Sequence, residues 1–283
     1  MILVTGATGT VGRAVIDGLL ALDMPVRALA RRPETARLPE SVEVVRADLG
    51  EPDSLAPALR GVDRVFLLST GPELSKHDAN IVAAAEDSGV HHIVKLSSGR
   101  AGDDAATDPI PMWHRAGEAA IREGGVPWTM VRPLGFMSNA LHWIPSIRAA
   151  DTVRAPFGQG RIAVVDPADI AAVAVKSLVE QGHSGNVYAL SGPQPLSPGE
   201  QTEILAEVLG RPLRYVETSA AESRSAMLDF GVGPEMADAI MSLRATALES
   251  FTSVVHPTVA QVTGRPPRSF RDWALGHRAE FLN

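Results

Sequence analysis

The chain begins Met1-Ile2-Leu3-Val4-Thr5-Gly6-Ala7-Thr8-Gly9-Thr10-Val11-Gly12, and this stretch decides the fold. Its apolar start predicts a short buried strand, and the glycines spaced GxxGxxG predict a tight turn into a helix. Such a turn lets the backbone approach a phosphate closely, while the helix N-terminus offers free N–H groups and a positive dipole end. The stretch therefore predicts a dinucleotide-binding turn, with a plain strand-to-helix turn as the alternative. The expected cofactor contacts are Gly6, Thr8, Gly9, Thr10, Val11 and Gly12.

Short apolar runs bounded by turn residues recur through the first half of the chain, and segments with helical spacing separate them. This alternation indicates a parallel sheet with helices on both faces. Because crossovers between parallel strands are right-handed, the sequence predicts an α/β Rossmann fold, a doubly wound parallel sheet with strand order 3-2-1-4-5-6. The six expected strands are residues 2–5, 26–30, 42–45, 65–68, 92–96 and 128–131.

The pattern loosens after Pro133, where residues 135–165 are rich in Pro, Gly and Trp. We expect residues 1–134 to form the NAD(P)-binding domain, with 161–190 contributing further elements. We expect residues 135–283 to form a smaller, discontinuous α/β substrate-binding subdomain. The elements expected beyond residue 166 are helix 167–181, strand 186–190, helix 198–209, strand 213–217 and helices within 219–250 and 268–281.

The composition narrows the classes of function. The chain has 283 residues, no cysteine and a net charge of −7. The lack of cysteine excludes thiolate nucleophiles and cysteine-ligated metals, and the histidines lack metal-ligand spacing, so no metal site is expected. The acidic balance argues against direct binding of nucleic acid. With neither a basic leader nor a membrane-spanning apolar run, we expect a cytoplasmic monomer or homodimer that has no membrane partner and acts on a small molecule.

The end of the second strand indicates which dinucleotide binds. NAD enzymes place an acidic residue there for the ribose 2′-hydroxyl, whereas this chain has Arg31 and Arg32. Guanidinium groups suit a 2′-phosphate, so we predict NADPH (NADP+) as the cofactor; a solvated arginine pair on a loop is the alternative. After the third strand, Asp48 and Leu49 lie where we expect the adenine, and the Asp48 carboxylate can accept a hydrogen bond from its amino group.

The remaining strand ends supply further candidate cofactor contacts. The carboxyl ends of parallel strands meet at one edge of the sheet, where ligands of this fold bind. A serine at such a position is otherwise a helix cap or turn former. The residues in question are Leu68, Ser69 and Thr70 after the fourth strand, Ser97 and Ser98 after the fifth, and Pro133 and Phe136 after the sixth.

Longer motifs run the length of the chain: VTGATGTVG at 4–12, ADL at 47–49, KLSS at 95–98, GVPWTMVRPLGFMSN at 125–139, VDPADIAAVA at 165–174 and TGRPPRSFRDWA at 263–274. Together with Arg31, they resemble the NmrA-like branch of the atypical short-chain dehydrogenase/reductase superfamily. The resemblance implies a Rossmann fold, an NAD(P)H site and a C-terminal subdomain that shapes the substrate pocket. Members of that branch include quinone, azo-dye, isoflavone and phenylcoumaran reductases, and also cofactor-binding regulators with little or no catalysis.

The chain departs from the wider superfamily at the active-site helix. Typical members carry Tyr-x-x-x-Lys, whose phenol donates the proton that accompanies hydride transfer. Neither tyrosine of this chain has a lysine four residues on, and aligning IPMWHRAGEAAI places Ile110 and His114 at the Tyr and Lys positions. An ordinary histidine pKa of about 6.5 would let His114 exchange a proton near neutrality. His114 is therefore expected either to donate the proton or to hydrogen-bond the nicotinamide ribose.

The hydroxyl pair Ser97 and Ser98 resembles the family's site beside the nicotinamide, so Ser98 joins His114 as a catalytic candidate. Aromatic and other apolar residues near the predicted cleft could form a floor for a flat aromatic substrate. The alternative is that they are ordinary core of the second subdomain. These residues are Met112, Trp113, Phe136, Met137, Trp143 and Phe157.

Two functions follow from these features. The first is an NADPH-dependent oxidoreductase that transfers hydride to a flat carbonyl, quinone or enone substrate, with His114 or water supplying the proton. The aromatic cluster favours this enzyme. The second is an NADP(H)-sensing regulatory binding protein with little or no catalysis, which the missing Tyr–Lys pair favours.

Overall fold

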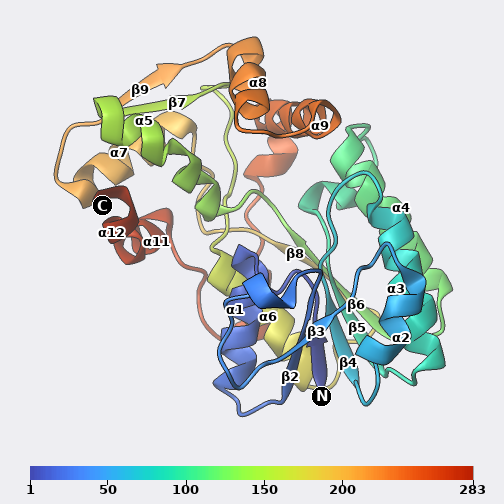
Figure 1. Ribbon diagram of the computed structural model, residues 1–283. Coiled ribbons are helices and arrows are strands. Elements are labelled where there is room, and N and C mark those ends of the chain that lie inside the picture. Colours follow the sequence, from blue (N-terminus) through green and yellow to red (C-terminus); the bar gives the residue numbers. More distant parts are fainter. Residues whose placement is uncertain (283) are drawn as a thin grey trace. The chain divides into compact units, whose positions relative to one another are not determined.

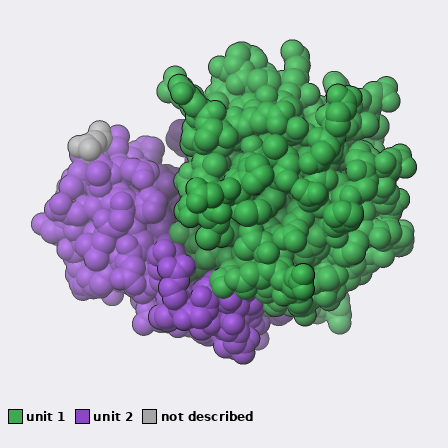
Figure 2. All heavy atoms as spheres, turned by 90° about the horizontal axis from the view of Figure 1, so that it is seen from below, with its two compact units in different colours: residues 1–106, 111–133, 167–189 green, residues 107–110, 134–166, 190–283 purple. Residues whose placement is uncertain are grey.

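The computed structural model describes residues 1–282 and contains two compact units (Figures 1 and 2). Unit 1 comprises residues 1–106, 111–133 and 167–189. Unit 2 comprises residues 107–110, 134–166 and those from 190 onward. Each unit is held by its own buried apolar cluster.

Unit 1 is built around a seven-stranded sheet with the order β3-β2-β1-β4-β5-β6-β8. Strands β1 to β6 pair in parallel throughout, so the predicted Rossmann fold and its strand order are confirmed. The strands are β1 (Ile2–Val4), β2 (Val26–Ala30), β3 (Glu43–Arg46), β4 (Arg64–Leu67), β5 (His92–Leu96), β6 (Trp128–Pro133) and β8 (Val187–Leu190).

Helices cover both faces of this sheet (Figure 1). On one face α1 packs tightly against α6, and Gly18 permits the approach because a Cβ there would lie 3.0 Å from Val175 Cγ2. On the other face, buried residues such as Ile81 and Ile121 join the strands in one apolar cluster. The helices are α1 (Thr10–Leu20), α2 (Leu55–Ala58), α3 (Leu74–Asp87), α4 (Pro109–Glu123) and α6 (Pro167–Val179), with short 3₁₀ turns at Pro33–Thr35, Pro52–Ser54 and Gly99–Gly102.

Unit 2 is built around a parallel pair of strands, β7 (Thr152–Ala155) and β9 (Arg214–Glu217). Phe270 and Trp273 stack in its core with ring centroids 5.4 Å apart. Strand β7 was not predicted, because its four residues lie in a Pro- and Gly-rich stretch and their partner strand is remote in sequence. The helices are α5 (Ile144–Ala150), α7 (Pro198–Leu209), α8 (Ala220–Asp229), α9 (Pro234–Ala245), α10 (Thr258–Thr263), α11 (Phe270–Gly276) and α12 (Arg278–Leu282), with 3₁₀ turns at Met137–Trp143, Thr246–Leu248 and Ser250–Ser253.

Over residues 1–282, no helix has both the length and the apolar character needed to cross a membrane. In the same part of the chain, no group of three or more His, Asp or Glu side chains is arranged to hold a metal ion.

Candidate active site

The glycine turn after β1 has the shape that a phosphate requires. Gly6 has a φ of +60°, and its carbonyl oxygen accepts a hydrogen bond from the Gly9 N–H at 3.0 Å. A Cβ on Gly12 would overlap that same carbonyl oxygen, so only glycine lets α1 begin this close to the turn. Within the described chain, no side chain caps the N-terminus of α1 and no acidic residue occupies its first turn. Its N–H groups are therefore available to an anion such as a pyrophosphate.

The other predicted residues of this turn differ in exposure. Thr8, Gly9 and Thr10 are exposed, so their backbone and hydroxyl groups can reach a ligand. Val11 is buried in the core of unit 1, which leaves only its backbone for such a contact. Leu68 packs beside the turn, where a Cβ on Gly6 would lie 2.9 Å from its Cδ2 atom.

The edge beside this turn carries concentrated positive charge. Strands β1 and β2 run parallel, so their carboxyl ends share one edge of the sheet, and Arg31 and Arg32 are exposed just after β2. Arg13 adds a third guanidinium, which donates to the carbonyl oxygens of Thr8 at 3.1 Å and Arg37 at 2.7 Å. This arrangement can bind a phosphate monoester.

Asp48 follows β3 and is half-buried. Its Oδ1 atom accepts the Gly50 N–H at 2.8 Å, and its own N–H donates to Ser54 Oγ at 3.0 Å. These bonds fix the loop that carries the carboxylate. The neighbouring Leu49 is also half-buried, and its carbonyl accepts a bond from Asn80 of α3 at 2.8 Å.

One strand of the unit 1 sheet carries a fully buried lysine. Lys95 on β5 and Asp78 on α3 are both fully buried, with Nζ and Oδ2 2.9 Å apart. Lys95 Nζ also donates to Ser69 Oγ at 2.7 Å, and Ser69 in turn donates to Asp78 Oδ1 at 2.5 Å. Gly117 of α4 makes room, because a Cβ there would overlap Asp78 Oδ2. Burial lowers the pKa of Lys95, and the Asp78 charge opposes that shift without cancelling it.

Unit 1 contains a second buried carboxylate, on α4 rather than α3. Glu118 of α4 is fully buried and accepts bonds from Ser97 Oγ at 2.6 Å, Arg132 Nε at 2.8 Å and an Arg122 nitrogen at 2.8 Å. Burial alone would raise the Glu118 pKa, but the hydrogen bonds from Arg132 and Ser97 and the arginine charges hold that pKa below its ordinary value. The hydroxyl proton of Ser97 is thus used inside the protein.

His114 lies on α4, one turn before Glu118, and is half-buried. Its Nδ1 atom is shielded from solvent and has no hydrogen-bond partner within residues 1–282. Burial lowers the pKa of His114 to about 3, the Lys95 charge adds to the shift, and the Glu118 charge opposes it. The expectation of an ordinary histidine pKa is therefore wrong: the ring is neutral at pH 7. A neutral imidazole can hydrogen-bond a ligand but is not a strong acid at that pH.

The remaining predicted positions in unit 1 follow from the same strand ends. Ser98 is half-buried and precedes the 3₁₀ turn at Gly99–Gly102. In the described part of the chain, its side chain makes no capping hydrogen bond to that turn. Thr70 is exposed after β4, and Pro133 is buried at the end of β6.

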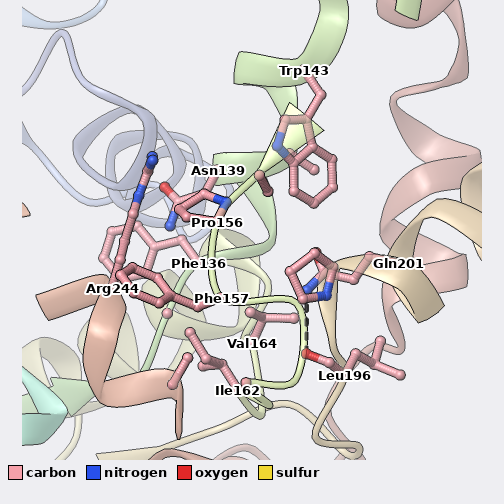
Figure 3. Close-up of a pocket in the computed structure, with 16 residues that line it drawn as sticks. Phe136, Asn139, Trp143, Pro156, Phe157, Ile162, Val164, Leu196, Gln201 and Arg244 are labelled. Carbon is pink, nitrogen blue, oxygen red and sulfur yellow. Dashed lines mark hydrogen bonds between the residues drawn. The ribbon is translucent and has the colours of Figure 1, made fainter. Parts of the chain in front are cut away.

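Unit 2 contains a cavity of about 120 Å³, and Figure 3 shows its lining. Most of the wall is apolar, and the polar side chains that reach it are Asn139, Gln201 and Arg244. Aromatic residues from two segments meet here, because Phe136 and Trp143 precede α5 whereas Phe157 follows β7. The other apolar lining residues include Pro156, Ile162, Val164 and Leu196.

The predicted substrate residues are thus divided. Phe136, Trp143 and Phe157 line the unit 2 cavity. Met137 does not line it; its side chain is 1% exposed and packs in the unit 2 core, as the core alternative expected. Met112 is exposed and Trp113 is half-buried, both on the part of α4 that belongs to unit 1.

Three residues with unusual settings were missed in the sequence. Lys95 and Asp78 form the buried pair, and a lysine inside the apolar run Ile93–Leu96 was the available signal, since a buried ammonium group needs a partner. Arg244 gave no such signal, because it lies in an ordinary helical pattern of α9.

Comparison with known proteins agrees with this geometry. A protein family described as NAD(P)H-binding matches residues 6–181. The chain is 47% identical to (4-alkanoyl-5-oxo-2,5-dihydrofuran-3-yl)methyl phosphate reductase of Streptomyces griseus and 37% identical to NAD(P)H azoreductase of Xenophilus azovorans, over 99% of each chain in both cases. It superimposes on the NADPH complex of the NADPH-dependent quinone oxidoreductase QOR2 of Escherichia coli with a TM-score of 0.86, at 26% identity and covering 100% of both chains.

The Rossmann sheet, the glycine turn and these relatives define the class: the chain is an NAD(P)H-dependent oxidoreductase that acts on a small molecule. More particularly, it belongs to the NAD(P)H-binding family, in the NmrA-like branch of the atypical short-chain dehydrogenases/reductases that its motifs resemble.

Proposed function

We propose that this protein is an NADPH-dependent reductase that transfers hydride to a flat, conjugated carbonyl compound, either a quinone or an enone. The observation that carries the proposal is His114, a neutral imidazole with an unpartnered buried nitrogen at the position where the wider superfamily has its catalytic lysine. A site without a strong acid suits substrates whose reduced form delocalises its own negative charge.

The preference for NADPH rests on the charge beside the glycine turn. Arg31 and Arg32 are exposed after β2, where NAD enzymes have an acidic residue, and Arg13 lies close by. A phosphate monoester can accept two hydrogen bonds from one guanidinium, which a 2′-hydroxyl cannot match in charge.

The remaining residues have proposed roles in holding this cofactor. The N–H groups of the turn and of α1 would bind the pyrophosphate, and the Asp48 carboxylate would accept a hydrogen bond from the adenine amino group. When bound, the nicotinamide supplies the hydride. We propose that Leu49, Leu68, Ser69, Thr70, Ser97, Pro133 and Phe136 complete the contacts, Ser69 and Ser97 through their backbone because their hydroxyl protons are already donated.

His114 and Ser98 are the proposed groups beside the reacting atoms. The neutral His114 ring holds a hydroxyl of the nicotinamide ribose or an oxygen of the substrate, and the Ser98 hydroxyl can donate to the same oxygen. Because His114 is not protonated at pH 7, the proton that completes the reduction comes from water. Burial is the main cause of the lowered His114 pKa that keeps the ring neutral, and the Lys95 charge adds to it.

The relatives support the substrate class. Their names describe reduction of a quinone, an azo compound and an alkanoyl-oxo-dihydrofuran that carries a phosphate. All of these are conjugated acceptors of hydride. The last is the substrate of the relative that is 47% identical, so a conjugated furanone is the favoured enone.

The test is anaerobic oxidation of NADPH, with NADH in parallel, against a panel of quinones, furanone enones and azo dyes. The expected result is turnover of quinones or furanone enones with NADPH preferred. Tight NADPH binding without turnover of any compound would contradict the proposal and would support the sensing function instead.

A further inference from the structure

One arginine in unit 2 lacks the partner that its burial requires. Three arginines of this unit are half-buried: Arg211, Arg224 and Arg244. Arg211 pairs with Asp151 at 3.1 Å, and Arg224 pairs with Asp238 at 2.5 Å. Within residues 1–282, no hydrogen bond or ion pair satisfies the side chain of Arg244. A guanidinium keeps its charge in proteins, so this half-buried cation loses part of its hydration without gaining a charged partner in that part of the chain.

Arg244 instead lines the unit 2 cavity. Arg244 belongs to the C-terminal turn of α9, and Figure 3 shows its side chain in the wall of the cavity together with Phe136 and Phe157. Burial lowers its pKa, which reflects the same loss of solvation. The negative end of the α9 dipole favours a cation in this turn. That effect explains the position on the helix, but it leaves the five N–H donors unused.

The part of the wall that contains Phe157 is held in place by backbone contacts. Phe157 has a φ of +58°, a conformation that costs energy for a side chain of this size. Gly160 N–H donates to the Phe157 carbonyl at 2.8 Å, and Arg161 N–H donates to the Ala247 carbonyl at 2.8 Å. A Cβ on Gly160 would overlap Ala247, three residues after Arg244. The loop and the end of α9 are therefore fixed against each other, which sets the aromatic wall relative to the guanidinium.

The dimensions and lining specify a ligand. A cavity of about 150 Å³ holds benzene in another protein, so a space of 120 Å³ accepts one small ring. The apolar wall suits the ring, while the Asn139 and Gln201 amides can orient polar substituents. The guanidinium suits an anion, because it can bind a phosphate or carboxylate through two parallel hydrogen bonds.

We infer that the unit 2 cavity binds a flat conjugated substrate that carries an anionic group, and that Arg244 recognises this group. The inference rests on the proposed function and adds the charge of the substrate to it. Arg244 sets specificity for the anionic substrate and takes no part in hydride transfer.

The test compares one ring with and without its anion. Turnover of 1,4-benzoquinone-2-sulfonate and of 1,4-benzoquinone is measured with NADPH in the wild type, in Arg244→Met and in Arg214→Met. Arg214 is an exposed arginine of the same unit outside the cavity lining. Loss of one charge-assisted pair should lower the ratio of kcat/KM for sulfonate over neutral quinone by about 10- to 100-fold in Arg244→Met, mainly through KM. Arg214→Met should keep the wild-type ratio. Because the ratio is compared between proteins, the effect of the sulfonate on quinone reactivity cancels.

A binding measurement without turnover separates this inference from the proposed function. Calorimetric titrations use phenyl phosphate and benzoate on the same three folded proteins, and they also distinguish a phosphate site from a carboxylate site. Binding of either anion that Arg244→Met weakens at least tenfold would support the inference, even if no quinone is turned over. Equal binding by all three proteins, or loss of NADPH affinity in Arg244→Met, would overturn it. Arg244→Lys should restore part of the affinity.

Discussion

The buried charges of unit 1 and the charge in the unit 2 cavity differ in whether the protein supplies their partners. In unit 1, Lys95 meets Asp78 and Ser69, and Glu118 meets Ser97 and two arginines. In unit 2, the Arg244 side chain lines the cavity and forms no hydrogen bond or ion pair within residues 1–282. A charge that the protein already neutralises holds the fold, whereas one that it leaves unpaired is available to a ligand. The following experiments, from the largest expected effect to the smallest, test this difference.

Lys95→Met should cause the largest loss of stability. It leaves the buried Asp78 carboxylate with the Ser69 hydroxyl as its remaining donor, and breaking such a pair costs about 3–5 kcal/mol. The free energy of unfolding in urea measures the effect. Lys176→Met is the matched control, because its ion pair with Glu180 lies on the surface of α6 and contributes at most about 0.5 kcal/mol. Equal losses in both variants would show that the buried pair has no special weight.

Gly12→Ala should cause the second-largest effect, a loss of cofactor affinity. The added Cβ overlaps the Gly6 carbonyl oxygen, and overpacking of about 1–3 kcal/mol would lower NADPH affinity by roughly 5- to 150-fold. A fluorescence titration of the folded variant with NADPH gives the dissociation constant. Gly276→Ala provides the control, since a Cβ there meets nothing within 4 Å. Unchanged NADPH affinity in Gly12→Ala would place the pyrophosphate elsewhere.

Arg31→Ala should separate the two dinucleotides. Loss of one guanidinium–phosphate contact should lower NADPH affinity by about tenfold and NADH affinity by less than about threefold. The same titration measures both cofactors. Arg60→Ala, which removes an exposed arginine from the loop before β4, should change neither. Equal weakening of NADPH and NADH in Arg31→Ala would contradict the proposed 2′-phosphate site.

Arg244→Met should leave the free energy of unfolding within about 0.5 kcal/mol of the wild type, or raise it. The reason is that the substitution removes a poorly solvated charge and breaks no pair. Urea unfolding of this variant beside Lys95→Met compares the two units directly. A loss above about 2 kcal/mol would mean that Arg244 has a structural partner in the folded protein.

Titration of His114 should not change kcat/KM in the physiological pH range. Its folded pKa of about 3 keeps the ring neutral, so kcat/KM for a quinone should stay flat within about twofold between roughly pH 5 and 8. An inflection near the ordinary histidine pKa that His114→Gln removes would show that the ring acts as an acid. Stability gives a second readout, since only the unfolded chain binds this proton below about pH 6.5. The free energy of unfolding should fall as the pH drops from there towards 3, less so in His114→Gln.

Much of unit 1 could be predicted because its signals are local. The glycine turn, the apolar strands and the helical spacing each occupy a few consecutive residues. Together they were enough to predict the order of the first six strands. Side-chain partners were harder, because Lys95 and Asp78 are 17 residues apart and meet only once α3 packs on the sheet. The histidine pKa likewise depends on burial that no motif reveals.

Unit 2 was less predictable because its cavity is assembled from distant segments. Phe136, Trp143 and Phe157 were expected at the site and line the cavity, whereas Met137, adjacent in sequence to Phe136, faces the core. Neighbouring residues on an irregular segment point in different directions, so composition alone could not separate them. Arg244 joins these residues from a helix, nearly ninety positions after Phe157, which no local pattern could indicate.

The most direct test of the central claim follows the hydride itself. A furanone enone is reduced anaerobically with NADPH that carries deuterium at one or the other C4 position, and the product is analysed by mass spectrometry and NMR. Direct hydride transfer predicts one deuterium on carbon in the product from only one of the two labelled cofactors. A reduced product without deuterium from either cofactor, or NADPH bound without any reduction, would contradict the account.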